Sequence, residues 1–204
     1  MSAHRQSRRE GTPSPQNITF IQQNVDRCAN NLRVIHQILT TSGTLAEIIM
    51  AQEPLAGNTR LPKLPGYRKY SPLSSWNSPS EAPRVCTYVH HRLAAKTTLL
   101  ASPVPGSRDL LLIRVGNVDF LNFYRGVDSN NDTWANFLAS RWSPTQRMII
   151  GGDFNAYHPS WSPAGTPAWN KGNEIADWMA QHNLVLSPAL VRSHTKGEPS
   201  AAAP

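Results

Sequence analysis

Polar residues follow three apolar segments of the sequence, and their types suit metal and phosphate chemistry. Asn24 follows the segment NITFIQQ, Glu53 follows the run IIMAQ, and Asp153 with Asn155 follows MIIGG. If these segments are strands, their tips can bring residues that are distant in sequence to one edge of a sheet. We therefore treat these four residues as one candidate site.

Each residue of this set suits one task in metal-assisted phosphate chemistry. A carboxylate such as Glu53 suits a hard divalent cation, Mg²⁺ or Mn²⁺, because Mg²⁺ prefers oxygen ligands and keeps several waters. Asn24 supplies a neutral oxygen or holds a bound water, and Asp153 with Asn155 orients a nucleophilic water and a phosphate oxygen. Singly, however, an Asp or Asn after a strand is more often a turn former or a helix cap.

The composition predicts one globular domain. The chain has 204 residues, of which 39% are hydrophobic and 16% charged, so it can fill a core and is not a highly charged disordered tail. No apolar run approaches the ~18 residues that a membrane-spanning helix needs. Two cysteines are too few for a disulfide framework, and no signal segment opens the sequence. We expect a nuclear or cytoplasmic protein without a membrane partner.

The net charge of +7 is concentrated in the middle of the chain. From Arg60 to Arg125 there are ten basic and three acidic residues, whereas the remainder is balanced. Such a segment is compatible with a polyanionic partner, although charge alone is more often explained by ordinary solvated strand faces. Within it, Lys69, Arg84 and Arg92 are the candidates for contacts with backbone phosphates.

Hydrophobic periodicity and turn residues predict a layered α/β domain. Strands are expected at 17–24, 46–51, 67–70, 84–90, 97–101, 110–115, 118–124, 147–151 and 184–186. Helices are expected at 30–41, where Gly43 is the C-cap, at 132–141, and at 173–181, where Asn173 is the N-cap. A proline-rich surface excursion separates the second strand from the later ones. Residues 1–16 are expected to be a disordered basic arm, 17–190 the domain, and 191–204 a disordered tail.

The ordered motifs of this sequence resemble a known superfamily. The series QQN, AQEP, NFYR and GGDFNAYHPSW is similar to the endonuclease/exonuclease/phosphatase superfamily, the fold of DNase I and of apurinic endonucleases. It is most similar to the endonuclease domain that precedes reverse transcriptase in non-LTR retrotransposons. The run KGNEIADWMAQHNLVLS also resembles that family, so the resemblance covers about Ile18 to Ser200. It implies a two-sheet sandwich flanked by helices.

The resemblance also implies an activity and a metal site. A member of this family is a Mg²⁺-dependent phosphodiesterase that nicks DNA, and no obligate protein partner is evident. Matched to the motifs, Asn24 and Glu53 fall on the metal-site positions, with Glu53 as the principal ligand.

Further residues match the family's phosphate-binding and catalytic positions. Tyr124 falls on a phosphate-facing tyrosine, with Asn122 beside it as a nucleic-acid contact. Asp153 falls on the residue that positions the attacking water, and Asn155 on the one that stabilises the scissile phosphate. His158 lies in the GDFN loop, where it is expected to contact nucleic acid rather than to act as the catalytic histidine.

The end of the sequence departs from the family's pattern. After SHTKGEPSA a family member continues into a strand bearing an aspartate and then a terminal Ser-Asp-His motif, whereas this sequence runs AAAP. The expectation is a sandwich without its last strands and without the terminal catalytic histidine.

Three functions stay open at this stage. The first is a DNA-nicking endonuclease, and the second is an inactive remnant that binds nucleic acid through the basic middle. The third is a phosphomonoesterase or phosphoinositide phosphatase of the same superfamily, against which the NFYR and HPSW contexts argue.

Overall fold

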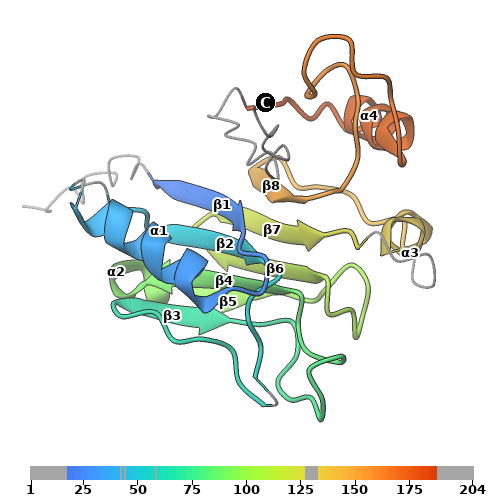
Figure 1. The fold of residues 1–204 in the computed structure, drawn as a ribbon. Helices are drawn as coiled ribbons and strands as arrows, with labels where there is room; N and C mark the ends of the chain where they lie inside the picture. The colour runs from blue at the N-terminus through green and yellow to red at the C-terminus, as the bar shows by residue number, and fades with distance from the viewer. Residues whose placement is uncertain (1–17, 42, 44, 58, 127–132, 188–204) are drawn as a thin grey trace, which may run out of the picture. The chain divides into compact units, whose positions relative to one another are not determined.

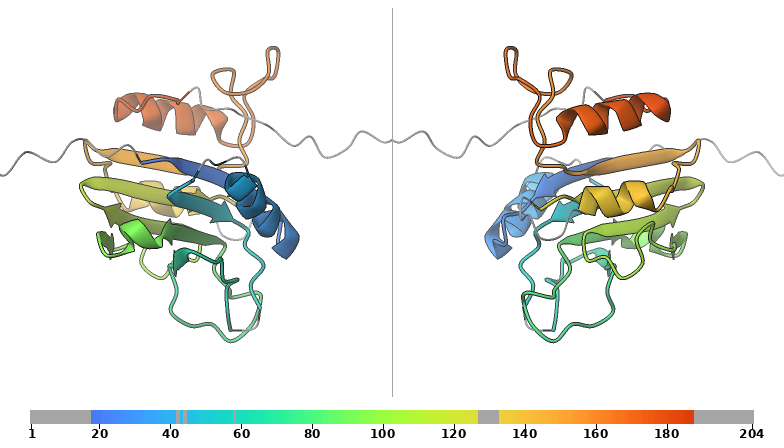
Figure 2. Two further views of the ribbon diagram at one scale, coloured as in Figure 1. Left: turned by 90° about the vertical axis from the view of Figure 1, so that its left-hand side faces the viewer. Right: turned by 90° about the vertical axis from the view of Figure 1, so that its right-hand side faces the viewer.

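Two four-stranded sheets form most of the structure, a computed structural model that describes residues 18–41, 43, 45–57, 59–126 and 133–187. Sheet A has the strand order β1 (Phe20–Asn24), β2 (Ile48–Gln52), β4 (Val85–His90), β3 (Tyr67–Tyr70). Sheet B has the order β5 (Thr97–Leu99), β6 (Leu110–Val115), β7 (Val118–Tyr124), β8 (Met148–Asp153). Figures 1 and 2 show the two sheets from three directions.

Each sheet contains one parallel pair, and these pairs determine where the polar strand ends lie. β1 runs parallel to β2, so that Asn24 lies opposite Gln52. β7 runs parallel to β8, so that Tyr124 lies opposite Asp153. The other strand pairs are antiparallel. Parallel strands end at the same edge of a sheet, so each sheet brings two carboxyl ends together there.

The core between the sheets consists of alternate residues of their central strands. Ile48 and Met50 of β2 pack with Val85 of β4 and with Ile113 and Phe120 of sheet B, and all five are buried. Side chains of a strand point alternately to its two faces, which explains the near-continuous apolar runs in β2 and β6. Residues between these positions face the outer layers.

Helices cover the outer faces of the sandwich. On sheet A, Leu32 of α1 (Ala29–Thr41) packs with Ile49 and Tyr88, and Figure 1 shows α1 lying across this sheet. On sheet B, Phe123 of β7 contacts Trp134 of α3 (Thr133–Ala139), with ring centroids 6.1 Å apart. The predicted two-sheet sandwich flanked by helices is confirmed. None of the helices in the described ranges has the length and apolar character to cross a membrane.

The chain divides into two compact units between Asn155 and Ala156. The single domain expected over 17–190 stays a prediction. The second unit contains α4 (Gly172–Gln181) and a two-residue bridge between Tyr157 and Trp169. The predicted arm (1–16) and tail (191–204) lie outside the described residues.

Most predicted elements are present, and the corrections lie at their ends. Residues 184–186 are irregular rather than a strand, and Val185 is 91% exposed. The short helix α2 (His91–Ala94) was not predicted. Helix α4 begins before Asn173, and its N-cap Lys171 makes no side-chain capping bond. Gly43 has a φ of 67°, which suits the predicted helix end.

A buried polar link joins the two sheets beneath the polar strand ends. Gln52 of sheet A donates from Nε2 to Oδ1 of Asn122 in sheet B at 2.6 Å, and it accepts from Gln22 Nε2 at 2.6 Å. Asn122 in turn donates to Thr87 Oγ1 and to the Ala51 carbonyl, each at 3.2 Å. Asn122 is fully buried. The structure therefore corrects its predicted role: the side chain joins the sheets and has no surface for nucleic acid.

Replacing Asn122 should destabilise the sandwich through this link. Asn122→Ala removes the shorter of the two acceptors of Gln52 Nε2 and leaves only the Met50 carbonyl at 3.3 Å. A buried polar group that loses its hydrogen bond costs about 1–3 kcal/mol. Urea unfolding followed by circular dichroism measures the loss. Gln37→Ala, an exposed change on α1, should stay within about 0.5 kcal/mol. Equal, small effects of both substitutions would show that the link contributes nothing.

Candidate active site at the edge of the two sheets

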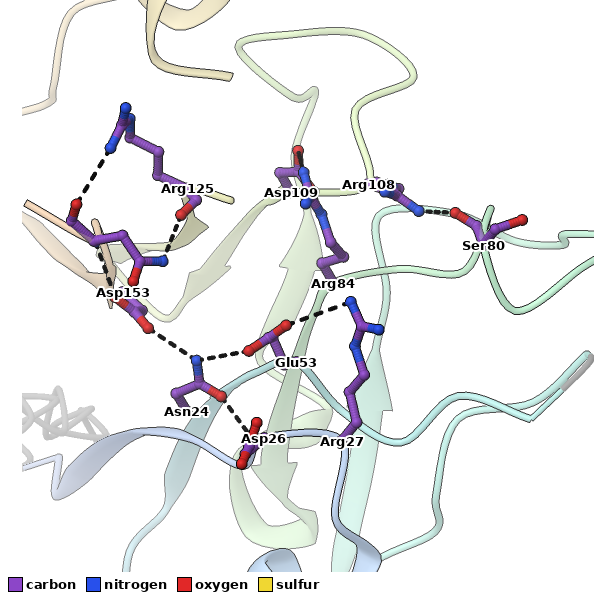
Figure 3. Close-up of polar contacts among 11 residues, drawn as sticks. Asn24, Asp26, Arg27, Glu53, Ser80, Arg84, Arg108, Asp109, Arg125 and Asp153 are labelled. Carbon is purple, nitrogen blue, oxygen red and sulfur yellow. Dashed lines mark hydrogen bonds and ion pairs between the residues drawn. The ribbon is translucent and has the colours of Figure 1, made fainter. Parts of the chain in front are cut away.

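Asn24 connects the two carboxylates that the sequence singled out. Its amide nitrogen Nδ2 donates to Glu53 Oε2 at 3.1 Å and to Asp153 Oδ2 at 2.8 Å. Figure 3 shows the asparagine between the two acids. Asn24 and Glu53 come from sheet A and Asp153 from sheet B, so the residues lie 29 and 129 positions apart in sequence. The structure thus brings the predicted residues together.

Several residues at this edge have a left-handed backbone conformation, which residues other than glycine rarely adopt. Glu53 has a φ of 47°, Asn155 of 46°, Asp26 of 49° and Arg27 of 51°. Left-handed residues other than glycine cost about 1–3 kcal/mol each and cluster at functional sites. Backbone hydrogen bonds hold the strained positions: the N–H of Glu53 donates to the Arg84 carbonyl at 2.8 Å.

Asp153 and Asn155 form a tight turn at the end of β8. The N–H of Asn155 donates to Oδ1 of Asp153 at 3.0 Å, while Asn155 Nδ2 donates to the carbonyl of Arg125 at 2.7 Å. Arg125 returns a contact from Nη1 to the Asn155 carbonyl at 3.3 Å. Both oxygens of Asp153 therefore accept hydrogen bonds, which fixes its carboxylate plane.

Tyr124 lies under Glu53 rather than at the surface. Its side chain is buried, and its hydroxyl forms a hydrogen bond with the Glu53 carboxylate. Burial raises the pKa of the phenol well above 10, and the hydrogen bond and the charge of Glu53 add to this, against a smaller opposing effect of Arg84. The phenol thus stays protonated and donates a hydrogen bond to Glu53, which orients this carboxylate.

Arg84 is buried beside the site and does not face solvent, which contradicts its predicted contact with backbone phosphate. Its Nε and Nη2 atoms each lie 2.5 Å from Asp109, on the two carboxylate oxygens. The guanidinium also lies 5.0 Å from the centroid of the Tyr124 ring. Thr133 Oγ1 donates to Asp109 at 2.6 Å. Arg84 precedes a strand of sheet A and Asp109 a strand of sheet B, so the pair connects the sheets next to Glu53.

The other two residues predicted to contact phosphate, Arg92 and Lys69, each have a partner within the chain. Arg92 pairs with Glu47 at 2.6 Å, and both lie at the opposite end of sheet A, since Glu47 precedes β2 and Arg92 follows β4. Lys69 is exposed and donates from Nζ to the Leu61 carbonyl at 2.9 Å.

His158 lies in the second unit. Its Nδ1 accepts from the N–H of Ser160 at 3.2 Å, and its ring lies 4.8 Å from that of Trp161. Trp161 donates from Nε1 to the Ala156 carbonyl at 3.0 Å. These local contacts shape the loop after Asn155. A contact of His158 with nucleic acid remains a prediction.

Sequence reasoning missed Arg27 and Asp109. Arg27 Nη2 lies 3.5 Å from Glu53 Oε1, and Figure 3 shows its side chain extending toward this carboxylate. Its position three residues after Asn24 was the available signal. Asp109 precedes an apolar strand without any motif around it, so only the three-dimensional structure reveals its pairing with Arg84.

The donor set suits a hard divalent cation. Glu53 and Asp153 both bond to the same nitrogen, so their carboxylates lie no farther apart than the two hydrogen bonds allow. Carboxylates held this close repel each other, and a divalent cation removes this repulsion. Within the described ranges no group of three or more His, Cys, Asp and Glu residues forms a metal cage. One or two carboxylates with several waters fit Mg²⁺, but not structural Zn²⁺, which takes four protein ligands.

The site lies in a fold with known relatives. Residues 118–201 match the sequence model of the family described as endonuclease-reverse transcriptase. No curated protein matches the chain. Among solved structures, the endonuclease domain of TRAS1, a telomere-specific non-LTR retrotransposon, is similar at a TM-score of 0.58 and 15% identity, over 81% of this chain and 70% of that domain.

Two further structures are similar at lower scores. An AP endonuclease from Archaeoglobus fulgidus has a TM-score of 0.46 and 14% identity, over 71% of this chain and 62% of that protein. A humanized D. rerio TDP2 with 14 mutations has a TM-score of 0.40 and 13% identity, over 74% of this chain and 67% of that protein.

The buried pair of Arg84 and Asp109 should contribute strongly to stability. Asp109→Ala leaves the Arg84 guanidinium buried without its carboxylate, and breaking a buried pair in this way costs about 3–5 kcal/mol. Urea unfolding of the variant measures the loss. As a control, Glu81→Ala removes an exposed carboxylate and should change stability by about 0.5 kcal/mol or less. A similarly small effect of Asp109→Ala would show that the buried pair of Arg84 and Asp109 does not stabilise the fold.

The raised pKa of Tyr124 predicts a loss of stability at alkaline pH. The unfolded chain releases the phenol proton near pH 10, whereas the folded chain retains it. The contribution is therefore complete below about pH 10 and is lost as the pH rises toward the folded pKa. Urea midpoints measured from neutral to alkaline pH should fall more steeply for the wild type than for Tyr124→Phe. Parallel curves would refute the assignment.

Proposed function

Since the chain has the DNase I-like fold of the endonuclease/exonuclease/phosphatase superfamily, we propose that it is a divalent-metal-dependent phosphodiesterase domain of retrotransposon type that nicks DNA. The observation that carries this proposal is the convergence of Glu53 and Asp153 on the amide of Asn24. The two acids come from different sheets. Strained backbone clusters at functional sites, and carboxylates that hold a divalent cation serve phosphate transfer.

Each residue at the edge has a defined task in this proposal. Glu53 is the principal metal ligand, and Asn24 holds the two carboxylates and a bound water. The bound cation supplies neutralisation of the charge that develops on a phosphate oxygen. Asp153, held at both oxygens, orients the attacking water. Asn155, held by its bonds to Asp153 and Arg125, stabilises the scissile phosphate, where a fixed donor is most effective.

Tyr124 has a different task from the one that the resemblance implied. We propose that its hydroxyl orients Glu53, because its proton is engaged by that carboxylate. Arg84 acts from behind the tyrosine ring. The two residues are positioning residues.

DNA is the proposed substrate on two grounds. The second half of the chain resembles an endonuclease-reverse transcriptase family, and the fold is shared with the endonuclease domain of a retrotransposon. Segment 60–69, which ends in β3 of sheet A, also contains no acidic residue and presents four exposed basic side chains, Arg60, Lys63, Arg68 and Lys69. Such a surface suits the phosphate backbone of a nucleic acid.

The proposal is tested by relaxation of supercoiled plasmid in the presence of Mg²⁺. The wild-type chain should convert supercoiled to open-circular DNA, and chelation with EDTA should abolish the reaction. Glu53→Gln and Asp153→Asn should each lower the rate by about a hundredfold or more, since removal of a fixed group that stabilises the transition state has effects of this size. The matched control Glu81→Gln removes an exposed carboxylate elsewhere and should keep the wild-type rate.

Other outcomes of the same assay would favour the other functions. Salt-sensitive DNA binding without any nicking would support a nucleic-acid-binding protein without catalysis. Release of phosphate from a phosphomonoester or an inositol phosphate, with plasmid left intact, would support a phosphatase. Nicking that survives both Glu53→Gln and Asp153→Asn would refute the proposed site.

A further inference from the structure

Arg27 combines a firmly held backbone with a loosely held side chain. Its N–H donates to the Glu53 carbonyl at 2.8 Å, and the neighbouring Asp26 N–H donates to Asn24 Oδ1 at 2.8 Å. Asp26 and Arg27 are both left-handed, at φ values of 49° and 51°. Two successive residues in this conformation are energetically costly when neither is glycine. The loop therefore attaches Arg27 directly to Glu53, and to Asn24 through the neighbouring Asp26.

The side chain of Arg27, by contrast, makes a weak contact. Its Nη2 lies 3.5 Å from Glu53 Oε1, longer than the 2.7–2.9 Å of a charge-assisted hydrogen bond. The side chain is 69% exposed, against 16% for Glu53. Exposed ion pairs of this kind contribute little to stability. Stability of the fold thus does not explain why a strained loop presents an arginine here.

The other arginine pairs of the first unit show what a structural ion pair looks like in this chain. Arg84 with Asp109, Arg92 with Glu47 and Arg114 with Asp119 have N to O distances of 2.5–2.6 Å. In each of these pairs the carboxylate is almost completely buried. The contact between Arg27 and Glu53 is about 1 Å longer, and the arginine side chain is exposed to solvent. Of these four pairs it is therefore the one that another partner can most easily break.

The charges at this edge indicate which group can replace Glu53 as the partner of Arg27. Glu53 and Asp153 attract the guanidinium in the absence of other cations. A divalent cation on Glu53 would cancel this attraction and leave the guanidinium beside the site with most of its five donors directed to solvent. The planar fork of arginine matches two oxygens of a phosphate. A phosphodiester that enters the site therefore meets Arg27 at its rim.

We propose that Arg27 binds a non-bridging oxygen of the nucleic-acid backbone, and that it leaves Glu53 for this phosphate when a divalent cation is bound. This inference rests on the proposed function, because it takes Glu53 as the metal ligand. It predicts that Arg27 competes with the cation but assists the nucleic acid. Removal of its charge must then change the two affinities in opposite directions.

The test compares Arg27→Gln with Arg33→Gln, which removes the same charge from an exposed position on α1. Mn²⁺ affinity is measured by electron paramagnetic resonance of the free ion, and affinity for a labelled 20-base-pair duplex by fluorescence anisotropy with Ca²⁺ present. Arg27→Gln should bind Mn²⁺ about two- to fivefold more tightly and the duplex about tenfold more weakly. The slope of log affinity against log salt should fall by about 0.9.

A conservative variant separates phosphate binding from structure. Arg27→Lys retains the charge, so it should preserve the salt slope while losing part of the affinity for the duplex. Arg33→Gln should leave Mn²⁺ binding unchanged and serves as the reference for charge loss alone. The proposal is overturned if both affinities of Arg27→Gln move in the same direction or match those of Arg33→Gln.

The failure of this inference and the failure of the proposed function give different results. If the wild-type chain binds no Mn²⁺, or if Glu53→Gln binds it as well as the wild type does, both the proposed metal site and the proposed role of Arg27 are refuted. If Glu53→Gln abolishes Mn²⁺ binding but Arg27→Gln affects neither affinity, only the role of Arg27 is overturned.

Discussion

One asparagine amide holds the two halves of this site together. Asn24 Nδ2 donates to Glu53 of sheet A and to Asp153 of sheet B, so a single neutral group lies between two negative charges. This arrangement requires both parallel strand pairs to end at the same edge, and it requires the sheets to keep their relative position. Carboxylates in such proximity repel each other unless a cation is present. The need to place these acids together therefore explains much of the surrounding structure.

The supporting structure is unusually polar for the interior of a sandwich. The link between Gln52 and Asn122 and the pair of Arg84 with Asp109 both join sheet A to sheet B directly below the site. Apolar contacts hold the sheets together but have little directional preference, whereas hydrogen bonds of 2.5–2.6 Å fix a position. The left-handed backbone of Glu53 is held by the hydrogen bond from its N–H to the carbonyl of Arg84, whose side chain forms one of these links.

The elements could be predicted from the sequence better than the contacts between them. Apolar segments bounded by turn residues located β6 and β7 at their observed bounds. The short apolar segment 184–186 was also predicted as a strand but is irregular, because strand formation depends on partners distant in sequence. The motifs also placed Glu53 and Asp153 in one site. They did not reveal that Arg84 is buried, because its partner Asp109 carries no local signal.

The most direct test of the central claim is a crystal structure of the chain soaked in Mn²⁺, with an anomalous difference map collected at the manganese edge. We expect one strong peak at the shared edge of the two sheets, about 2.1–2.4 Å from an oxygen of Glu53, with Asp153 and Asn24 beside it. A strong peak elsewhere, with Glu53 and Asp153 pointing away from each other, would refute a metal site at this edge.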